Sequence, residues 1–198
     1  MMLLPSVLIS ILNSILAAFS EIYVAVLGVY YKLQTFVYMP ANGIVQGMRP
    51  IIGYNYGAGE NDRVKQTIRY SLASAAVIML AGTLFALLIP EQILMLFDAD
   101  AELMSAGVTA LRIISLGFLV SAVGIIYSGT FEALGSGKNS LTVSLLRQFI
   151  ITIPLSLILS HFWGPVGVWI AFPVGEFCAS AAALLLLRRY HNGSFSPF

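Results

Sequence analysis

The sequence has few charged residues and a single cysteine. Only 10% of its 198 residues are Asp, Glu, Lys or Arg, against about 25% in soluble domains, so a soluble fold could not cover its surface with charge. Cys178 has no second cysteine to pair with, which excludes a secreted disulfide scaffold. The formal charge is +1 and no basic run is longer than Arg188-Arg189, which excludes nucleic-acid binding as the main role. At 59% hydrophobic residues and a mean hydropathy of +0.90, the composition is that of a membrane protein embedded in a lipid bilayer.

Long apolar segments divide the chain into predicted membrane helices. A helix needs roughly 20 mostly apolar residues to cross the bilayer, and the turn signal Gly164-Pro165 separates the last two segments. The fold class we predict is an all-α membrane protein, a bundle of six transmembrane helices in one domain over residues 1–190, with a short tail at 191–198. The predicted spans are residues 3–20, 26–50, 68–90, 108–133, 141–161 and 166–187.

Basic and acidic residues fall in different loops. The segment from the end of the second span to the start of the third holds Arg49, Arg63, Lys65 and Arg69, the loop after the fourth span holds Lys138, and the tail after the sixth holds the Arg188-Arg189 pair. The other loops hold Glu21, Glu91, Asp98, Asp100 and Glu102. Because cytoplasmic loops are enriched in Lys and Arg, we expect the first set of loops and the C-terminus to face the cytoplasm.

The second predicted helix carries polar side chains on one face. At 100° per residue they fall within an arc of roughly 80°, and Pro40 lies on the opposite side, where it removes a backbone hydrogen bond and is expected to bend the helix. This arrangement favours a helix that lines a wet cavity, with interhelical hydrogen bonding as the alternative. The polar face consists of Tyr31, Thr35, Tyr38, Asn42 and Gln46.

Four of the charged residues inside the predicted spans are functional candidates, because charge within the membrane is costly. Lys32 is close enough to a membrane surface to reach it, and Glu132 lies near the cytoplasmic end of its helix, so either can be structural. Arg147 and Glu176 occupy neighbouring antiparallel helices and can form an ion pair, although counting from the turn places them more than one helical turn apart in depth. The alternative for Glu176 is a role in proton or cation coupling.

Catalytic and metal-binding motifs are missing from the sequence. It contains no H-E-x-x-H and no G-x-S-x-G, and Gly135-Ser136-Gly137-Lys138 lacks the spacing of a phosphate-binding loop. We therefore expect no enzyme, no metal site and no cofactor.

Two sequence motifs are similar to a known transporter family. Residues 40–44 (PANGI) and 49–59 (RPIIGYNYGAG) closely resemble the eighth helix and following cytoplasmic loop of the MATE (multidrug and toxic compound extrusion) family. Pro5 and residues 128–135 (SGTFEALG) agree with this resemblance, which extends helix by helix over the chain.

The resemblance implies a fold and a function. MATE transporters have twelve helices in two six-helix lobes, and this sequence resembles the C-terminal lobe. The implied function is export of organic cations, drugs or amphipathic metabolites across the cell (plasma or inner) membrane by alternating access. The coupling ion would be Na⁺ or H⁺. The implied partners are an N-terminal lobe or a second copy of the chain, and a small-molecule substrate.

Two positions depart from the family pattern. Some MATE branches have a coupling carboxylate in the first and in the fourth helix of this lobe, where the matching residues here are Asn13 and Ser121. The coupling acid is therefore expected in the N-terminal lobe, or is Glu176. Two other functions remain as alternatives, a lipid-linked glycan flippase, which requires a strongly cationic cavity, and a half-size membrane subunit that does not transport. A membrane-embedded hydrolase is disfavoured because no nucleophile–base pair is present.

Overall fold

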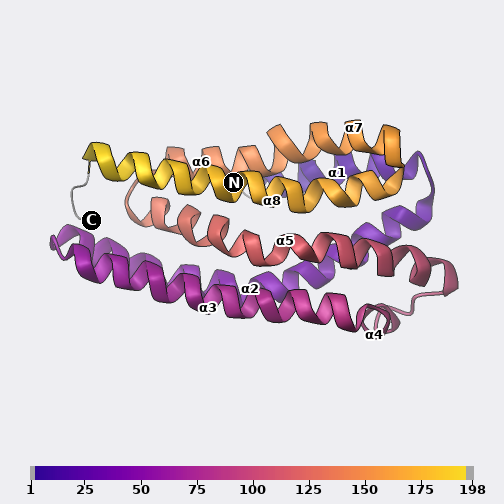
Figure 1. The fold of residues 1–198 in the computed structure, drawn as a ribbon, viewed down its shortest axis with the longest axis horizontal. Coiled ribbons are helices and arrows are strands. Elements are labelled where there is room, and N and C mark those ends of the chain that lie inside the picture. The colour runs from indigo at the N-terminus through magenta and orange to yellow at the C-terminus, as the bar shows by residue number, and fades with distance from the viewer. Residues whose placement is uncertain (1–2, 195–198) are drawn as a thin grey trace.

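The computed structural model describes residues 3–194 and is entirely helical over that range, apart from short turns. Residues 195–198 of the predicted tail lie outside the described part, and 191–194 continue the last helix instead of forming a separate tail. Figure 1 shows the helices lying side by side along the long axis of the molecule. In chain order they are α1 (Leu3–Ala17), α2 (Glu21–Gly57), α3 (Asn61–Leu88), α4 (Pro90–Met95), α5 (Ala101–Ala133), α6 (Gly137–Leu145), the π-helical segment η1 (Leu146–Thr152), α7 (Ile153–Trp163) and α8 (Pro165–Ser194).

Five helical segments in the described range are long and apolar enough to cross a membrane, where the sequence predicts six. They are Glu21–Gly57, Asn61–Leu88, Ala101–Ala133, Gly137–Trp163 and Pro165–Leu187. The predicted first span is the exception, since the apolar helix there covers only Pro5–Ala17. The described part of α1 has 15 residues, or about 22 Å at 1.5 Å per residue, which is shorter than the hydrocarbon core of a bilayer.

α5 is the central helix of the bundle. It packs against α2, α3 and α8, and in Figure 1 it lies between α8 and the α2–α3 pair. Its side chains Leu111, Ile114, Phe118 and Ile126 are almost fully buried. Many large apolar side chains on the outer helices are exposed instead, among them Phe85 and Leu88 of α3, as expected of surfaces that face lipid.

The two ends of the bundle carry opposite kinds of loop. The α1–α2 connection, α4 and the α7–α8 turn lie at one end, and the α2–α3 and α5–α6 turns and the end of α8 at the other (Figure 1). The loops that hold Glu21, Glu91, Asp98, Asp100 and Glu102 therefore lie at one end and those that hold most of the basic loop residues at the other, although Glu60 and Asp62 also lie at the basic end.

α2 and α5 begin earlier than hydropathy alone predicts, because polar residues cap them. Ser20 accepts a hydrogen bond from the Ile22 amide at the start of α2, and Asp100 accepts one from the Leu103 amide at the start of α5. Such caps place helix starts in polar sequence outside the apolar core of each span.

The C-terminal end of α2 corrects a second prediction. Residues 51–57, expected in a cytoplasmic loop, are helical, and only a short turn separates them from α3. Pro50 cannot donate a backbone hydrogen bond, but the helix continues because Ile52 and Asn55 are buried in the bundle. The Asn55 amide also donates to the Ile51 carbonyl at 2.8 Å.

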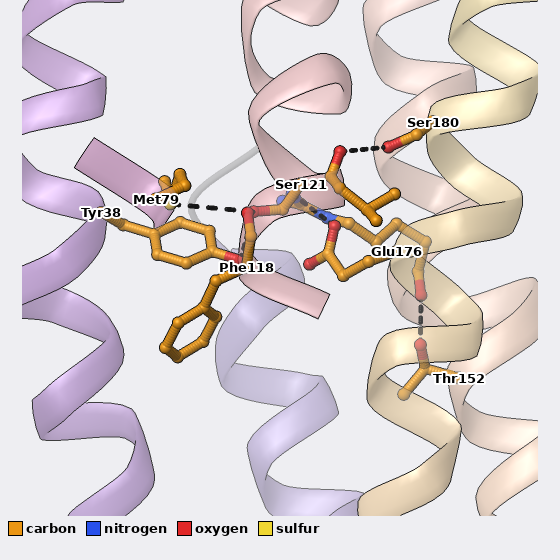
Figure 2. Close-up of polar contacts among 9 residues, drawn as sticks. Tyr38, Met79, Phe118, Ser121, Thr152, Glu176 and Ser180 are labelled. Carbon is orange, nitrogen blue, oxygen red and sulfur yellow. Dashed lines mark hydrogen bonds and ion pairs between the residues drawn. The ribbon is translucent and has the colours of Figure 1, made fainter. Parts of the chain in front are cut away.

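Small residues bring α5 and α8 into close contact. A Cβ atom at Gly117 would lie 3.1 Å from the Cα of Pro173, and one at Gly124 would lie 3.3 Å from the Ser180 hydroxyl. That hydroxyl donates to the Val120 carbonyl at 2.8 Å (Figure 2). The packing of α8 on α5 holds Glu176 in a fixed position relative to the polar face of α2.

Candidate functional site

A pocket of about 340 Å³ opens among α1, α2, η1 and α8. Its wall combines aromatic rings with polar and charged side chains, a mixture typical of small-molecule sites. Thr35, Met39 and Asn42 in this wall are largely exposed, so the pocket is open on one side. The described lining residues are Pro5, Leu8, Tyr31, Gln34, Thr35, Tyr38, Met39, Asn42, Arg147, Gln148, Thr152, Phe172 and Glu176.

Most of the predicted polar face of α2 lines this pocket. Tyr31, Thr35, Tyr38 and Asn42 all contribute to the wall, and the structure brings them together with Arg147 and Glu176. Gln46 is exposed one turn beyond Asn42 and is not among the described lining residues. The helical periodicity of the sequence therefore located one wall of the pocket.

The sequence interpretation missed the residues that other helices and the edges of the α2 face contribute. Gln34 and Met39 border the predicted stripe on either side, and a wider arc would have included them. Gln148 and Phe172 come from η1 and α8. The position of Gln148 next to Arg147 was a usable signal, whereas Phe172 looks in the sequence like any other apolar residue of a membrane helix.

Arg147 and Glu176 form the predicted ion pair. The Nη1 atom of Arg147 lies 3.7 Å from Oε2 of Glu176, so the estimate that they differ by more than one turn in depth is wrong for the side-chain ends. The long arginine side chain covers the difference. At 3.7 Å the contact is electrostatic and too long for a hydrogen bond, and Oε2 has no hydrogen-bond partner among the described residues.

A π-helical segment, which the sequence analysis did not predict, carries Arg147 and Gln148. In η1 the Thr152 hydroxyl donates to the Arg147 carbonyl, five residues earlier (Figure 2). A Cβ at Gly175 of α8 would lie 2.4 Å from that hydroxyl, so glycine is needed where α8 passes η1. π-Helical turns change the direction in which side chains point and are frequent at functional sites.

Tyr38 is fixed by a hydrogen bond across the bundle. Its hydroxyl donates to Oγ of Ser121 on α5 at 2.8 Å, and the Ser121 hydroxyl donates to the Phe118 carbonyl at 2.7 Å. Figure 2 shows the Glu176 carboxylate reaching from α8 toward Ser121 and Tyr38. Ser121, at the position where some MATE branches have an acid, thus holds an aromatic wall of the pocket.

A second, smaller pocket lies toward the basic end of the bundle, and Asn42 and Arg147 line both pockets. Here Arg49 of α2 forms an ion pair with Glu132 of α5. The Ser140 hydroxyl donates to Glu132 Oε1 at 2.8 Å and lies 2.6 Å from the Ser128 hydroxyl. Arg49, at the end of the predicted second span, continues the polar face of α2, seven residues after Asn42.

The remaining predicted residues, Lys32 and Pro40, lie away from the pocket. The Nζ atom of Lys32 is 5.6 Å from the centre of the Phe97 ring, a cation–π contact between α2 and the segment after α4. Pro40 is inside α2 and exposed, and the helix is continuous through it. The described residues contain no group of three or more His, Cys, Asp or Glu side chains that could hold a metal ion.

Apolar helices of membrane-spanning length around a polar, aromatic-walled pocket are typical of membrane transporters. The comparison with protein families identifies the branch. The family model MatE matches residues 1–158, and the chain belongs to this family, whose members are transporters and not enzymes.

Relatives in the family are multidrug exporters. The chain is 24% identical over 182 residues to the multidrug export protein MepA of Staphylococcus haemolyticus, a match that covers 92% of this chain and 40% of the relative. It is 27% identical over 177 residues to MepA of Staphylococcus aureus, a match that covers 89% of this chain and 39% of that relative. The chain therefore spans about 40% of the length of these relatives, which is consistent with one lobe.

Solved structures show the same fold. The MATE multidrug transporter DinF-BH, solved as a complex, is 38% identical with a TM-score of 0.79, covering 91% of this chain and 41% of that one. A MATE transporter in an outward-facing conformation is 25% identical with a TM-score of 0.89. The match covers 96% of this chain and 43% of that one. A MOP superfamily transporter from Pyrococcus furiosus shares the fold. It is 23% identical with a TM-score of 0.89, and the match covers 96% of this chain and 43% of that one.

Proposed function

We propose that this chain is the C-terminal lobe of an exporter of small amphipathic compounds, and that its pocket is half of the substrate cavity. The observation that carries the proposal is the pocket, in which Tyr31, Tyr38 and Phe172 supply aromatic surface beside the polar side chains of α2. Flat aromatic compounds with a charged group bind to such walls by stacking and cation–π contact. The match to MepA supports a multidrug exporter.

The mechanism we propose is alternating access, in which this lobe and a partner lobe rock about the pocket between them. The partner is an N-terminal lobe or a second copy of the chain, and it would cover the open side where Thr35, Met39 and Asn42 are exposed. Because α1 to α8 form one packed bundle, the lobe would move largely as a unit.

The coupling ion we propose is Na⁺ or H⁺, flowing inward as substrate leaves. Asn13 and Ser121 cannot carry charge, so the coupling carboxylate lies in the partner lobe or is Glu176. Oε2 of Glu176 accepts no hydrogen bond from the described residues, which supports it as a candidate.

We place the protein in the cell membrane with the basic end of the bundle and the C-terminus in the cytoplasm. Export from the cytoplasm then requires a pocket that opens alternately toward the Arg49–Glu132 end and toward the α4 end. The separation of basic and acidic loops supports this orientation.

The pocket is not built like that of a lipid-linked glycan flippase, which would need several unpaired cations. Among the described residues its wall holds one cation, Arg147, and that residue pairs with Glu176. Lys32 contacts Phe97 instead.

The experiment that tests the proposal compares two aromatic residues of α2 in a dye-efflux assay. Immunoblotting of native membranes first gives the size of the protein that carries this chain, and efflux is then measured in that protein. We expect Tyr31→Ala to reduce efflux of a flat cationic dye about tenfold, because the loss of one stacking contact costs about 1–2 kcal/mol. The matched control is Phe36→Ala, since Phe36 is 72% exposed and lies on the opposite side of the helix.

Equal efflux by both variants and the unaltered protein would contradict the assignment of the pocket. Collapsing the Na⁺ and H⁺ gradients in turn then identifies the coupling ion, and repeating this in Glu176→Gln tests the coupling role. If the variant keeps the same ion or pH dependence, the coupling carboxylate is not Glu176.

A further inference from the structure

The charges in the pocket wall oppose the binding of a cation. Nη1 of Arg147 lies 3.7 Å from Oε2 of Glu176, and these two residues are the charged ones in the described wall. A cation that approaches Glu176 is therefore also repelled by Arg147, and the repulsion is strong in a site away from bulk water. An exporter whose coupling ion or cationic substrate meets Glu176 needs a second place for the charge of Arg147.

The second pocket offers such a place. It has a volume of about 150 Å³, room for the end of an arginine side chain, and Arg147 lines it as well as the first pocket. Glu132 is the carboxylate in its described wall. Arg147 thus lies at the boundary between two pockets, each with one carboxylate that can pair with it.

Glu132 can accept a second arginine beside the one it already holds. Its Oε1 atom accepts a hydrogen bond from Ser140 at 2.8 Å, and its Oε2 atom pairs with Nη2 of Arg49. Nε of Arg49 has no hydrogen-bond partner among the described residues, so this pair does not use both nitrogens of one guanidinium edge. Because a carboxylate has about four acceptor sites, the guanidinium of Arg147 can bind Glu132 while Arg49 stays in place.

The direction of the helix favours a turn of Arg147 toward Glu132. Counted from the turn at Gly164, Glu176 lies nearer to that turn than Arg147 does, so Arg147 reaches toward the C-terminal end of its own helix to meet Glu176. Helical side chains tilt the other way, toward the N-terminus, where Ser140 contacts Glu132. The present contact with Glu176 is therefore loose, too long for a hydrogen bond, and against the natural tilt of the side chain.

We propose that Arg147 is a positioning residue that exchanges carboxylates, pairing with Glu176 while the pocket is empty and with Glu132 when a cation occupies Glu176. The exchange moves one positive charge out of the pocket as another enters, so the charge of the wall stays balanced. In the filled state Arg147 also ties η1 to α5 and, through Glu132, to Arg49 of α2. This inference rests on the proposed function and concerns the regulation of the same pocket.

The test measures cation binding in a variant of a residue outside the described wall of the binding pocket. Fluorescence polarisation gives the affinity of the full protein for rhodamine 6G, a flat monocationic dye. Glu132→Gln should weaken binding about tenfold, because Arg147 then has no second carboxylate and stays beside Glu176. The matched control is Glu60→Gln, which removes an exposed carboxylate at the same end of the bundle, outside the described walls of both pockets, and should leave the affinity unchanged.

Further variants separate the exchange from a loss of packing at Glu132. Arg147→Gln should bind the dye more tightly than the unaltered protein, and adding Glu132→Gln to it should change the affinity no further, because the exchanging charge is gone. Arg49→Gln frees Glu132 for Arg147, so it should leave the affinity unchanged or raise it, whereas a merely structural Arg49–Glu132 pair would make it fall. If Glu132→Gln does not fold, Arg49→Gln combined with Glu132→Gln leaves neither charge of that pair unpaired and should weaken dye binding in the same way.

A structure of the dye complex shows the exchange directly. The guanidinium of Arg147 should lie within about 4 Å of a Glu132 oxygen. Arg147 still paired with Glu176 in that complex, unchanged affinity in Glu132→Gln, an equal effect of Glu132→Gln with and without Arg147, or weaker binding by Arg49→Gln would overturn the inference while leaving export intact. Failure of the unaltered protein to bind or export the dye would instead contradict the proposed function itself.

Discussion

At the scale of single residues, the hydroxyl of Ser121 has the clearest structural task. It accepts a hydrogen bond from Tyr38 at 2.8 Å and so holds an aromatic ring against the pocket from the opposite helix. The hydroxyl of Ser121 therefore sets the orientation of this ring in the pocket wall.

The energy of this hydrogen bond can be measured by a double-mutant cycle of Tyr38→Phe and Ser121→Ala. Hydrogen bonds between membrane helices contribute about 0.6 kcal/mol on average and less than about 2 kcal/mol. We expect a coupling free energy in that range from thermal unfolding of the detergent-solubilised protein. Strictly additive effects would show that the two hydroxyls do not interact.

The sequence predicted most, but not all, of the residues on the polar face of α2. Tyr31, Thr35, Tyr38 and Asn42 were found in the sequence because helical periodicity places them on one face. Arg49 lies on that face too, but it was grouped with the basic residues that set the orientation and not with the polar face. Residues 51–57, after Pro50, were expected in a loop. A proline removes one hydrogen bond, and burial of Ile52 and Asn55 outweighs that loss.

At the scale of helices, the contact of α5 with α8 positions the site. It depends on Gly117, where a Cβ would lie 3.1 Å from the Pro173 Cα atom. Proline cannot move away easily, because its ring is fixed to the backbone. The same contact explains why Glu176, three residues later, is held beside the pocket.

A glycine-to-alanine pair tests this contact. Gly117→Ala should lower the free energy of unfolding by about 1–3 kcal/mol, the cost of overpacking a tight contact. Gly28→Ala is the matched control, since nothing lies within 4 Å of a Cβ there, and the higher helix propensity of alanine should leave stability unchanged or raise it by up to about 1 kcal/mol. Both free energies of unfolding are measured on the detergent-solubilised protein. Equal destabilisation by the two substitutions would contradict the importance of the α5–α8 contact at Gly117.

η1 shows what sequence periodicity cannot predict. Residues 141–161 were predicted as one helix, and the signal for a change is Pro154, just after η1, which removes the helical hydrogen bond to the Ile150 carbonyl. A proline alone does not predict a π-helical turn. The π-helical turn is formed where α8 packs against this segment at Gly175, a contact between residues far apart along the helices. The ion pair was predicted from helix adjacency, whereas the way Arg147 and Gln148 both reach the pocket depends on this turn.

At the scale of the whole molecule, most acidic loop residues of the described bundle lie at one end and most basic loop residues at the other, and the pocket is open on one side. Both features are those expected of a lobe that faces a second lobe across a substrate path. The alternation of the loops was predictable from the positions of Lys and Arg alone. The end of α1 at Ala17 was not predictable, because residues 1–20 carry no charge and this end depends on the turn before α2.

Cysteine labelling tests the orientation of the bundle. In a Cys178→Ser background, Leu96→Cys at the α4 end should react with a membrane-impermeant maleimide added to intact cells, since Leu96 is 83% exposed. Ala58→Cys, in the exposed turn between α2 and α3, should react only after the cells are opened. The reverse pattern would place the C-terminus outside the cell.

Two prolines inside α2 have a mechanical consequence. Because Pro40 and Pro50 have no amide proton, the carbonyls of Phe36 and Gln46 lack their usual helical donor. The helix is therefore a rod with two compliant joints, ten residues or about 15 Å apart. Tyr31 and Tyr38 lie before the first joint, and Asn42 and Arg49 lie between the two. The part of α2 before Pro40 can thus bend while the segment that holds Arg49 against Glu132 stays in place. The shape of the pocket can then change without loss of this ion pair.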